Sequence, residues 1–338
     1  MKNFLYSLIL LGGLLSIASC STDFDMYADY KDVSVVYGLT DISDDTTWIK
    51  ITKAYTGPGN ALLLAQNPDS SNYPYKLGVS LDGRKNGNDL TPIIFDTITI
   101  HYKAKTDSIL GEDGQVIIIN PFYSPNQLMY YAVGSLDKDA KYTLTINKKD
   151  EVLTASSDIV DDFDITSPRN RISFIENRDD DIEWMSTKNG KRYEVSIRFK
   201  YSEFAPGYAD TLKESIGYFL GVVSSKNVDG GEELKKTYNG SNFYSILESE
   251  LEPIPNVERW ADSVYITIAC GSQELATYLD INSGGATLLE EVPKYSNVEG
   301  GSGIFASRHT ILKPVRLSST TEATLVKDYN LGFKYKTK

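Results

Sequence analysis

Hydrophobic and polar positions alternate along most of the chain, and short polar turns separate the alternating runs. This pattern predicts β-strands with one buried face. DVSVVYGL at residues 32–39 and TWIKITKAY at residues 47–55 flank the polar segment DISDDT and predict a hairpin. KYTLTI at residues 141–146 and VLTASSDI at residues 152–159 flank NKKDE and predict a second one. The chain is therefore expected to be rich in β-sheet.

A proline and several polar residues interrupt the strand patterns near residue 168, which favours a domain boundary there. Beyond it, Asn189 and Gly190 separate the alternating runs of DIEWMSTKNGKRYEVSIRFKYSE, and an Asn-Gly pair in this setting favours a hairpin turn. We expect a first β-sandwich domain at residues 32–167 and a second β-rich domain at residues 168–335.

Short helices are predicted mainly in the second domain. Ser241 is expected to cap NFYSILESEL, whose apolar residues fall on one face of a helix. Ser272 precedes QELATYLDI, and Ser319 and Glu322 have the spacing of a capping box before ATLVKDY. Because each helix is short, packing against a sheet must stabilise it.

Two segments resemble known sandwich folds. LDKDAKYTLTINKKDEVLTASSDI, at residues 136–159, resembles the hairpin of transthyretin-like and immunoglobulin-like sandwiches. The strand that contains Trp184 and the Asn-Gly turn after it are similar to the core of fibronectin type III domains. The resemblances imply an all-β fold with short helices, made of two β-sandwich-like domains, of which the second carries helical insertions.

The N-terminal segment MKNFLYSLILLGGLLSIAS combines a lysine, a short apolar run and small residues. The run is shorter than the ~20 residues that a bilayer-spanning helix needs, so residues 1–19 predict a signal peptide. Ile17, Ala18 and Ser19 precede Cys20, and this tetrapeptide resembles the bacterial lipobox. The resemblance implies cleavage before Cys20 and acylation of its sulfur and its new amino group.

Acylation of Cys20 would anchor the protein to a membrane, because each buried methylene contributes roughly 0.8 kcal/mol and several chains act together. Ser21 resembles the signal that passes lipoproteins to the outer membrane, and residues 20–31 are expected to form a tether. The predicted location is the outer membrane, on its periplasmic or its outer face. Cys270, the only other cysteine, lies in an alternating run and is expected to be a small buried residue.

The chain of 338 residues carries a formal net charge of −12. A strongly acidic protein repels phosphate backbones, so nucleic acid is not an expected partner.

Few residues suit the common catalytic motifs. Gly301, Gly303 and Ala306 match the dinucleotide-binding string, but the strand-like HTILKPVRL follows instead of a helix, so a glycine-rich loop or bulge entering an edge strand is predicted. The chain contains only two histidines, His101 and His309, and both are expected at the surface. Neither a serine hydrolase triad nor a zinc site is predicted, and no cofactor is expected.

Acidic residues leave two alternatives open. Asp179, Asp180, Asp181 and Glu183 form a run before Trp184, which we interpret as a solvated turn, with a glycosidase carboxylate pair as the alternative. DISDDT and LDKDA contain the oxygen ligands that calcium prefers, but neither has the spacing of an EF-hand loop. Both are interpreted as turns.

The 23 tyrosines indicate binding more than catalysis. Tyr73, Tyr75, Tyr123 and Tyr130 lie near proline or asparagine in SSNYPYKL and FYSPNQLMYY, where loops are predicted. A flat ring with a polar edge suits a glycan or a peptide, so these four are predicted ligand contacts. The alternative is that they are ordinary strand residues.

YSNVEGGSGIFASR at residues 295–308 and YGLTDISDDTTWIKITKAYTGPGNALLLAQ at residues 37–66 resemble blocks of a domain-of-unknown-function family. That family consists of outer-membrane lipoproteins often encoded beside TonB-dependent receptors. The resemblance implies an accessory protein of an uptake system and supplies no catalytic residues.

We therefore expect a lipid-anchored protein of the cell envelope with a non-enzymatic binding role, whose partner is a TonB-dependent receptor, a glycan or a peptide. A fimbrial or adhesin subunit that assembles by strand addition is one alternative. A secreted glycosidase is the other. The related pilin type is cut at an arginine soon after the lipid site, and no arginine occurs between Cys20 and Arg84.

Overall fold

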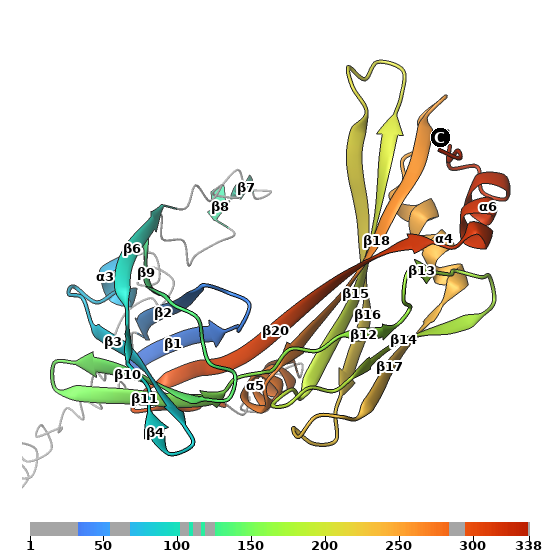
Figure 1. Ribbon diagram of the computed structural model, residues 1–338. Helices are drawn as coiled ribbons and strands as arrows, with labels where there is room; N and C mark the ends of the chain where they lie inside the picture. The colour runs from blue at the N-terminus through green and yellow to red at the C-terminus, as the bar shows by residue number, and fades with distance from the viewer. Residues whose placement is uncertain are drawn as a thin grey trace, which may run out of the picture.

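The computed structural model describes residues 33–54, 68–101, 108–110, 116–118, 126–283 and 295–336. Strands make up most of these residues and the helices are short, which confirms the prediction of an all-β fold with short helices. Figure 1 shows two lobes that are joined by one long strand, β20. We refer to them as the first lobe, which contains the N-terminal strands, and the second lobe.

The first lobe is a sandwich of two sheets. On one side lie β1 (Val33–Thr40), β2 (Thr46–Ala54), β9 (Asn126–Val133) and β6 (Asp96–His101). The other side contains β19 (Val298–Glu299), β11 (Glu151–Asp158), β10 (Lys141–Lys148), β3 (Gly78–Lys85), β4 (Asn88–Asp89) and β5 (Ile93–Ile94). The short elements α3 (Pro68–Ser71), β7 (Ser108–Leu110) and β8 (Val116–Ile118) complete the described part of this lobe.

Alternation builds the core of the first lobe, as the sequence predicts. Both expected hairpins are present, as β1 with β2 and β10 with β11. In β10, Tyr142, Leu144 and Ile146 point inward while their neighbours are more exposed. They meet Val36 and Ile49 from the facing sheet in one buried cluster. Burying each such side chain contributes about 1.5–3 kcal/mol, so the strand pattern is also the source of stability.

The second lobe is also a sandwich. Its larger sheet contains β16 (Leu212–Ser224), β15 (Arg192–Phe204), β18 (Glu258–Gly271) and part of β20 (Ser302–Leu317), with β13 (Arg171–Ile172) paired to β20. Its smaller sheet contains β12 (Ile165–Ser167), β14 (Asp179–Met185) and β17 (Glu233–Asn239). The helices are α4 (Gly240–Glu250), α5 (Gln273–Ser283) and α6 (Ser319–Lys327).

Strand β20 belongs to both lobes. Its residues 302–307 pair in parallel with β1, and its residues 308–315 pair antiparallel with β18. The glycine-rich segment enters β20 at residues that pair with β1 alone among the described strands, since the pairing with β18 begins only at Arg308. Gly303 has a φ of 108°, and a Cβ atom built there would lie 2.0 Å from the carbonyl oxygen of Val36. The glycine is needed for the close approach of β20 to β1.

The buried residues do not divide at a single point of the chain. Ile159 belongs to the core of the first lobe and Val160 to that of the second, whereas Val298 and Phe305 belong to the first lobe again. The first change falls between Ile159 and Val160, before the boundary predicted at residue 168. The end of the segment that was expected to belong to the first lobe, which includes Phe163 and Ile165, therefore packs in the second lobe.

The Asn-Gly turn does not form a hairpin. Asn189 has the left-handed φ of 63° that a turn favours, but β14 before it pairs with β12 and β17, whereas β15 after it pairs with β16 and β18. The turn carries the chain from one sheet to the other. The side chain of Asn189 donates to the carbonyl oxygen of Ile159 and its backbone N–H donates to that of Val228, which holds the crossing in place.

The predicted helices exist, with two caps one or two residues earlier than expected. Asn239, and not Ser241, caps α4, since its side chain accepts a hydrogen bond from the N–H of Ser241. Ser318, and not Ser319, caps α6 by accepting from the N–H of Thr321. A side chain caps best from just before the first helical residue, and the strand geometry upstream sets where that residue lies.

Candidate functional site

Two of the four tyrosines predicted to contact ligand are buried in the core of the first lobe. Tyr73 and Tyr130 have 9% and 1% of their surface exposed. The Tyr73 hydroxyl is 2.6 Å from Ser34 Oγ, and that of Tyr130 accepts from the N–H of Leu77. The prediction is corrected for these two residues, because their rings fill the core of the first lobe. Tyr75 is half-buried beside Tyr73.

Tyr123 and the predicted lipid site Cys20 lie outside the described residues. Cys270 is buried and free in β18, as expected.

Only one of the two histidines lies at the surface. His101 is exposed at the end of β6, where its Nδ1 is 2.7 Å from Asn126 Oδ1. His309 is buried, so the expectation of a surface histidine is wrong for it. Its Nδ1 lies 2.8 Å from Asp41 Oδ1 and its Nε2 lies 3.0 Å from Asp162 Oδ1. The burial follows from the central position of β20, which the sequence pattern does not show.

This cluster lies where the lobes meet. Asp41 follows β1, His309 is on β20, and Asp162 is on the segment that enters the second lobe. The hydrogen bond that His309 makes to the Asp41 carboxylate raises the pKa of His309, although burial opposes it. Burial raises the pKa of Asp41, but hydrogen bonds from His309 and Ser43 outweigh it and lower that pKa overall. The two groups therefore stabilise each other's charged forms.

The segments weighed for calcium form ion pairs and hydrogen bonds with protein groups. In DISDDT, Asp41 is held by His309 and by Ser43. In LDKDA, Asp137 and Asp139 both contact the ammonium group of Lys85. Among the described residues, no group of three or more His, Cys, Asp or Glu side chains is arranged to hold a metal ion.

The acidic run 179–183 lies in strand β14 and not in a turn, which corrects the interpretation from sequence. Its register with β17 places Asp181 beside Lys235 Nζ at 2.8 Å and Thr237 Oγ1 at 2.5 Å. The hydrogen bond from Lys235 lowers the pKa of Asp181. A glycosidase acid needs a raised pKa, so Asp181 is suited to holding β17 and not to donating a proton.

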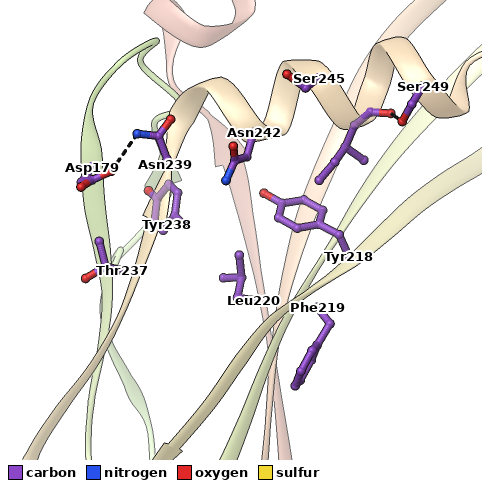
Figure 2. Close-up of a pocket in the computed structure, with 11 residues that line it drawn as sticks. Asp179, Tyr218, Phe219, Leu220, Thr237, Tyr238, Asn239, Asn242, Ser245 and Ser249 are labelled. Carbon is purple, nitrogen blue, oxygen red and sulfur yellow. Dashed lines mark hydrogen bonds between the residues drawn. The ribbon is translucent and has the colours of Figure 1, made fainter.

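A groove of about 640 Å³ opens beside α4, the helix that follows β17 (Figure 2). Its walls come from β16, from the end of β17 with Asp179 of β14, and from one face of α4. The lining residues are Asp179, Tyr218, Phe219, Leu220, Thr237, Tyr238, Asn239, Asn242, Ser245, Ile246 and Ser249. We call this site the α4 groove. Its volume falls within the usual range of roughly 300–1,000 Å³ for ligand sites.

Helix α4 lies beside the groove because its apolar face is anchored in the second lobe. Phe243 and Leu247 are fully buried, and the Phe243 ring stacks on Phe174 with centroids 4.1 Å apart. The opposite side of the helix carries Asn242 and Ser245 into the groove. This is the ordinary consequence of an amphipathic helix that packs along the edge of a sandwich.

A β-bulge shapes the strand wall of the groove. Val195 pairs with Gly221 and Ser196 pairs with Phe219, so Leu220 is the extra residue of β16. Residues 218–220 all line the groove. A bulge bends its strand and increases the local twist, which changes the direction of β16 beside these residues. Tyr218 and Leu220 point toward the helix, and Phe219 points away from it (Figure 2).

Two polar groups of the groove have no hydrogen-bond partner among the described residues: the Asn242 amide and the Tyr218 hydroxyl. The remaining polar side chains are engaged. Asn239 donates to Asp179 and accepts from the N–H of Ser241, while Ser245 and Ser249 donate to carbonyl oxygens of their own helix. Asn242 and Tyr218 are therefore the groups that can bond to a bound molecule directly.

Burial favours the protonated form of both tyrosines that line the groove. Burial raises the pKa of Tyr218 above its ordinary value, and it raises that of Tyr238, whose hydroxyl donates to the carbonyl oxygen of Ser173. No lysine, arginine or histidine is among the residues that line the groove. The groove is thus a polar and aromatic site whose only ionisable acid, Asp179, is bonded to an amide.

Sequence reasoning did not find this site, since its walls come from separate segments that only the folded sheets bring together. The one local sign was the spacing of Asn242, Ser245 and Ser249, which places three polar side chains on one helical face.

Comparisons with known proteins identify no family. No family model matches the chain, and no curated protein matches it. One solved structure that the chain is similar to is the C-terminal globular domain of an oligosaccharyltransferase from Pyrococcus abyssi, at 10% sequence identity and a TM-score of 0.25. The match covers 85% of this chain and 50% of that one, so the chain spans half the length of that structure.

A second solved structure is the calcium-binding domain CBD12 of CALX1.1, at 9% identity and a TM-score of 0.14, covering 84% of this chain and 99% of that one. No helix in the described part of the chain has both the length and the hydrophobicity that a membrane span requires.

Proposed function

We propose that this chain is a lipid-anchored protein of the cell envelope that binds a ligand in a non-enzymatic role, as an accessory of a TonB-dependent uptake system. The observation that carries the proposal is the sequence Ile17-Ala18-Ser19-Cys20 after a short apolar run. Acyl chains on Cys20 would hold the protein at the outer membrane.

The arrangement of the lobes supports a binding role. Residues 21–32 separate Cys20 from the first described strand, a reach of at most roughly 40 Å. This tether leads into β1 of the first lobe, whereas the α4 groove is in the second lobe. The anchor and the site are thus on different lobes, which leaves the groove available to a ligand while the protein is held at a membrane.

The anchor is tested by replacing each of the two cysteines in turn. Cys20→Ala is expected to release the protein from the membrane fraction of its native host, because the acylation site is lost. Cys270→Ser is the matched control and is expected to stay in that fraction, since Cys270 is buried in β18. Mass spectrometry of the native protein should find acyl groups on its N-terminal residue. Membrane association of Cys20→Ala at the level of the unaltered chain would refute the anchor.

The accessory role is tested by purifying the unaltered protein from native membranes in mild detergent. Recovery of a TonB-dependent receptor in a fixed ratio would support it. Repeated recovery of the protein alone would contradict this part of the proposal and leave the anchor standing.

A further inference from the structure

We infer that the α4 groove binds a neutral, polyhydroxylated ligand of the oligosaccharide class. The inference rests on the proposed binding function and names the chemistry of its ligand. It concerns the folded second lobe and not the anchor, so the two are tested separately.

The free polar groups of the groove match sugar hydroxyls. The Asn242 amide offers two donors and an acceptor, and the Tyr218 hydroxyl can donate and accept. A sugar hydroxyl also does both, so each contact can be satisfied in either direction. Because the neighbouring Asn239 is held by Asp179 at 2.8 Å and by the N–H of Ser241 at 3.0 Å, this wall of the groove is fixed before any ligand arrives.

The charge of the groove favours a neutral ligand. No cationic side chain lines it, so an anionic ligand would find no counter-charge and would approach a chain with a formal net charge of −12. The single acid that lines the groove, Asp179, accepts a hydrogen bond from the Asn239 amide. A ligand would therefore be recognised through hydroxyl and amide groups, and such contacts do not require the ligand to be charged.

Aromatic rings provide the apolar part of the contact. Phe219, which lines the groove, exposes 61% of its surface, and the half-buried Tyr218 ring forms part of the groove wall. The C–H faces of a pyranose ring pack on flat aromatic surfaces, while its hydroxyls remain free to bond to polar groups at the ring edges. Few large apolar side chains of the second lobe are as exposed as Phe219, and a bound ligand would cover the Phe219 ring.

The alternative occupant, a peptide that extends the sheet at β16, is disfavoured by the shape of the strand. Strand addition needs a regular row of backbone N–H and C=O groups. The bulge at Leu220 interrupts that row at the groove, and Gly221 has a φ of 127°, outside the range of a regular strand. Bulges of this kind protect sheet edges from pairing with other strands.

The test measures sugar binding to the full acylated protein, purified in a detergent without a sugar headgroup. The probes are maltohexaose, cellohexaose, xylohexaose and mannohexaose, each titrated by isothermal calorimetry. At least one should bind with a dissociation constant below about 1 mM. Absence of saturable binding by all four would overturn the inference, while membrane association of the same sample would leave the anchor intact.

Two variants locate the binding. Phe219→Ala and Asn242→Ala should each raise the dissociation constant of the bound sugar about tenfold or more, because each removes an exposed contact. Phe204→Ala is the matched control, since Phe204 exposes 39% of its surface on β15 and does not line the groove. The dissociation constant of the sugar from the Phe204→Ala variant should equal that of the unaltered protein. Equal affinity of all three variants would place the sugar elsewhere and refute the assignment.

A last pair of probes separates the ligand classes. Polygalacturonate, an anionic glycan, and an uncharged peptide of alternating threonine and valine should bind at least tenfold more weakly than the best neutral sugar. Tighter binding of the peptide, lost in Phe219→Ala, would assign the groove to strand addition and overturn the sugar class. Circular dichroism and the urea unfolding midpoint of every variant should match those of the unaltered protein.

Discussion

The two lobes share a strand and a sandwich architecture, but their cores are built differently. The core of the second lobe contains a network of stacked aromatic rings among its aliphatic residues, in which Phe174 stacks on Phe243 at 4.1 Å and Tyr244 on Tyr329 at 4.5 Å. The core of the first lobe consists mainly of aliphatic strand residues such as Leu81.

The difference explains where a groove can form. In the first lobe both faces of the sandwich are sheets, and their alternating side chains meet directly. In the second lobe the smaller sheet has only three strands, β12, β14 and β17. The aromatic rings of Phe243 and Tyr244 attach α4 beside it. A helix and a sheet edge do not fit as closely as two sheets, and the α4 groove lies along that junction.

The largest effect is expected from truncating a ring at the centre of this network. Phe174→Ala should lower the free energy of unfolding by about 3–5 kcal/mol, because it leaves a cavity and removes the stacking partner of Phe243. Leu81→Ala, the counterpart in the first lobe, should cost about 2–5 kcal/mol. Urea unfolding followed by tryptophan fluorescence measures both. A loss below about 1 kcal/mol for Phe174→Ala would contradict the role assigned to the aromatic network.

A second prediction concerns a buried ion pair in the second lobe. Arg259 Nε lies 2.7 Å from Glu203 Oε2, and the two side chains expose 2% and 8% of their surface. Glu203→Gln should lower stability by roughly 3 kcal/mol, since it leaves a buried guanidinium without its counter-charge. The matched control is Asp96→Asn, at an exposed pair in which Lys76 and Asp96 expose 52% and 67% of their side-chain surface, and it should be close to neutral. Equal midpoints in a thermal scan of the two variants would refute the prediction.

The third prediction concerns the junction of the lobes and its dependence on pH. His309 has a raised pKa in the folded protein, so its contribution to stability is complete below the unfolded value of about 6.5 and is lost as pH rises through the folded value. Asp41 has a lowered pKa, so its contribution is present above about 3.9 and is lost as pH falls through its folded value. Stability should therefore decrease as pH rises from about 6 to above the folded pKa of His309.

The urea midpoint as a function of pH tests this junction. His309→Gln should flatten the decrease, because glutamine carries no titrating proton. His101→Gln, at an exposed histidine, should keep the slope of the unaltered protein. A slope that survives in His309→Gln would assign the pH dependence to other groups.

The smallest effect on stability is expected at the groove. Phe219→Ala should change the unfolding midpoint very little, because its ring is mostly exposed and is not part of the buried core. The same variant is expected to lose sugar affinity, so binding and folding should separate at this residue. A large loss of stability in Phe219→Ala would mean that the ring supports the fold and would remove it from the site.

The sequence predicts local elements of this fold well and their assembly poorly. The hairpins β1–β2 and β10–β11 follow from alternation alone, since partner strands lie next to each other in the chain. Three helices were expected and found. The Asn189 turn was misassigned because the same backbone conformation serves a hairpin and a crossing between sheets, and distant contacts decide between them.

The site was less predictable than the fold. Tyr73 and Tyr130 resemble loop tyrosines in sequence, yet their rings are in the core. Tyr130 lies within strand β9, and the hydroxyl of Tyr73 is beside Ser34 of β1. His309 is buried only because a strand from near the C-terminus inserts beside β1. The α4 groove depends on a bulge in β16, and a bulge is set by pairing with β15, which leaves no sign in the residues themselves.

The position of β20 has a mechanical consequence. A pull on a lipid tether would enter the body through β1, whose parallel ladder with β20 runs from Val35 to Thr40. Force along those strands loads all of their hydrogen bonds in shear at once and not one after another. If the proposed lipid anchor is present, tension at the membrane would thus pass from β1 into β20, the strand that continues into the second lobe.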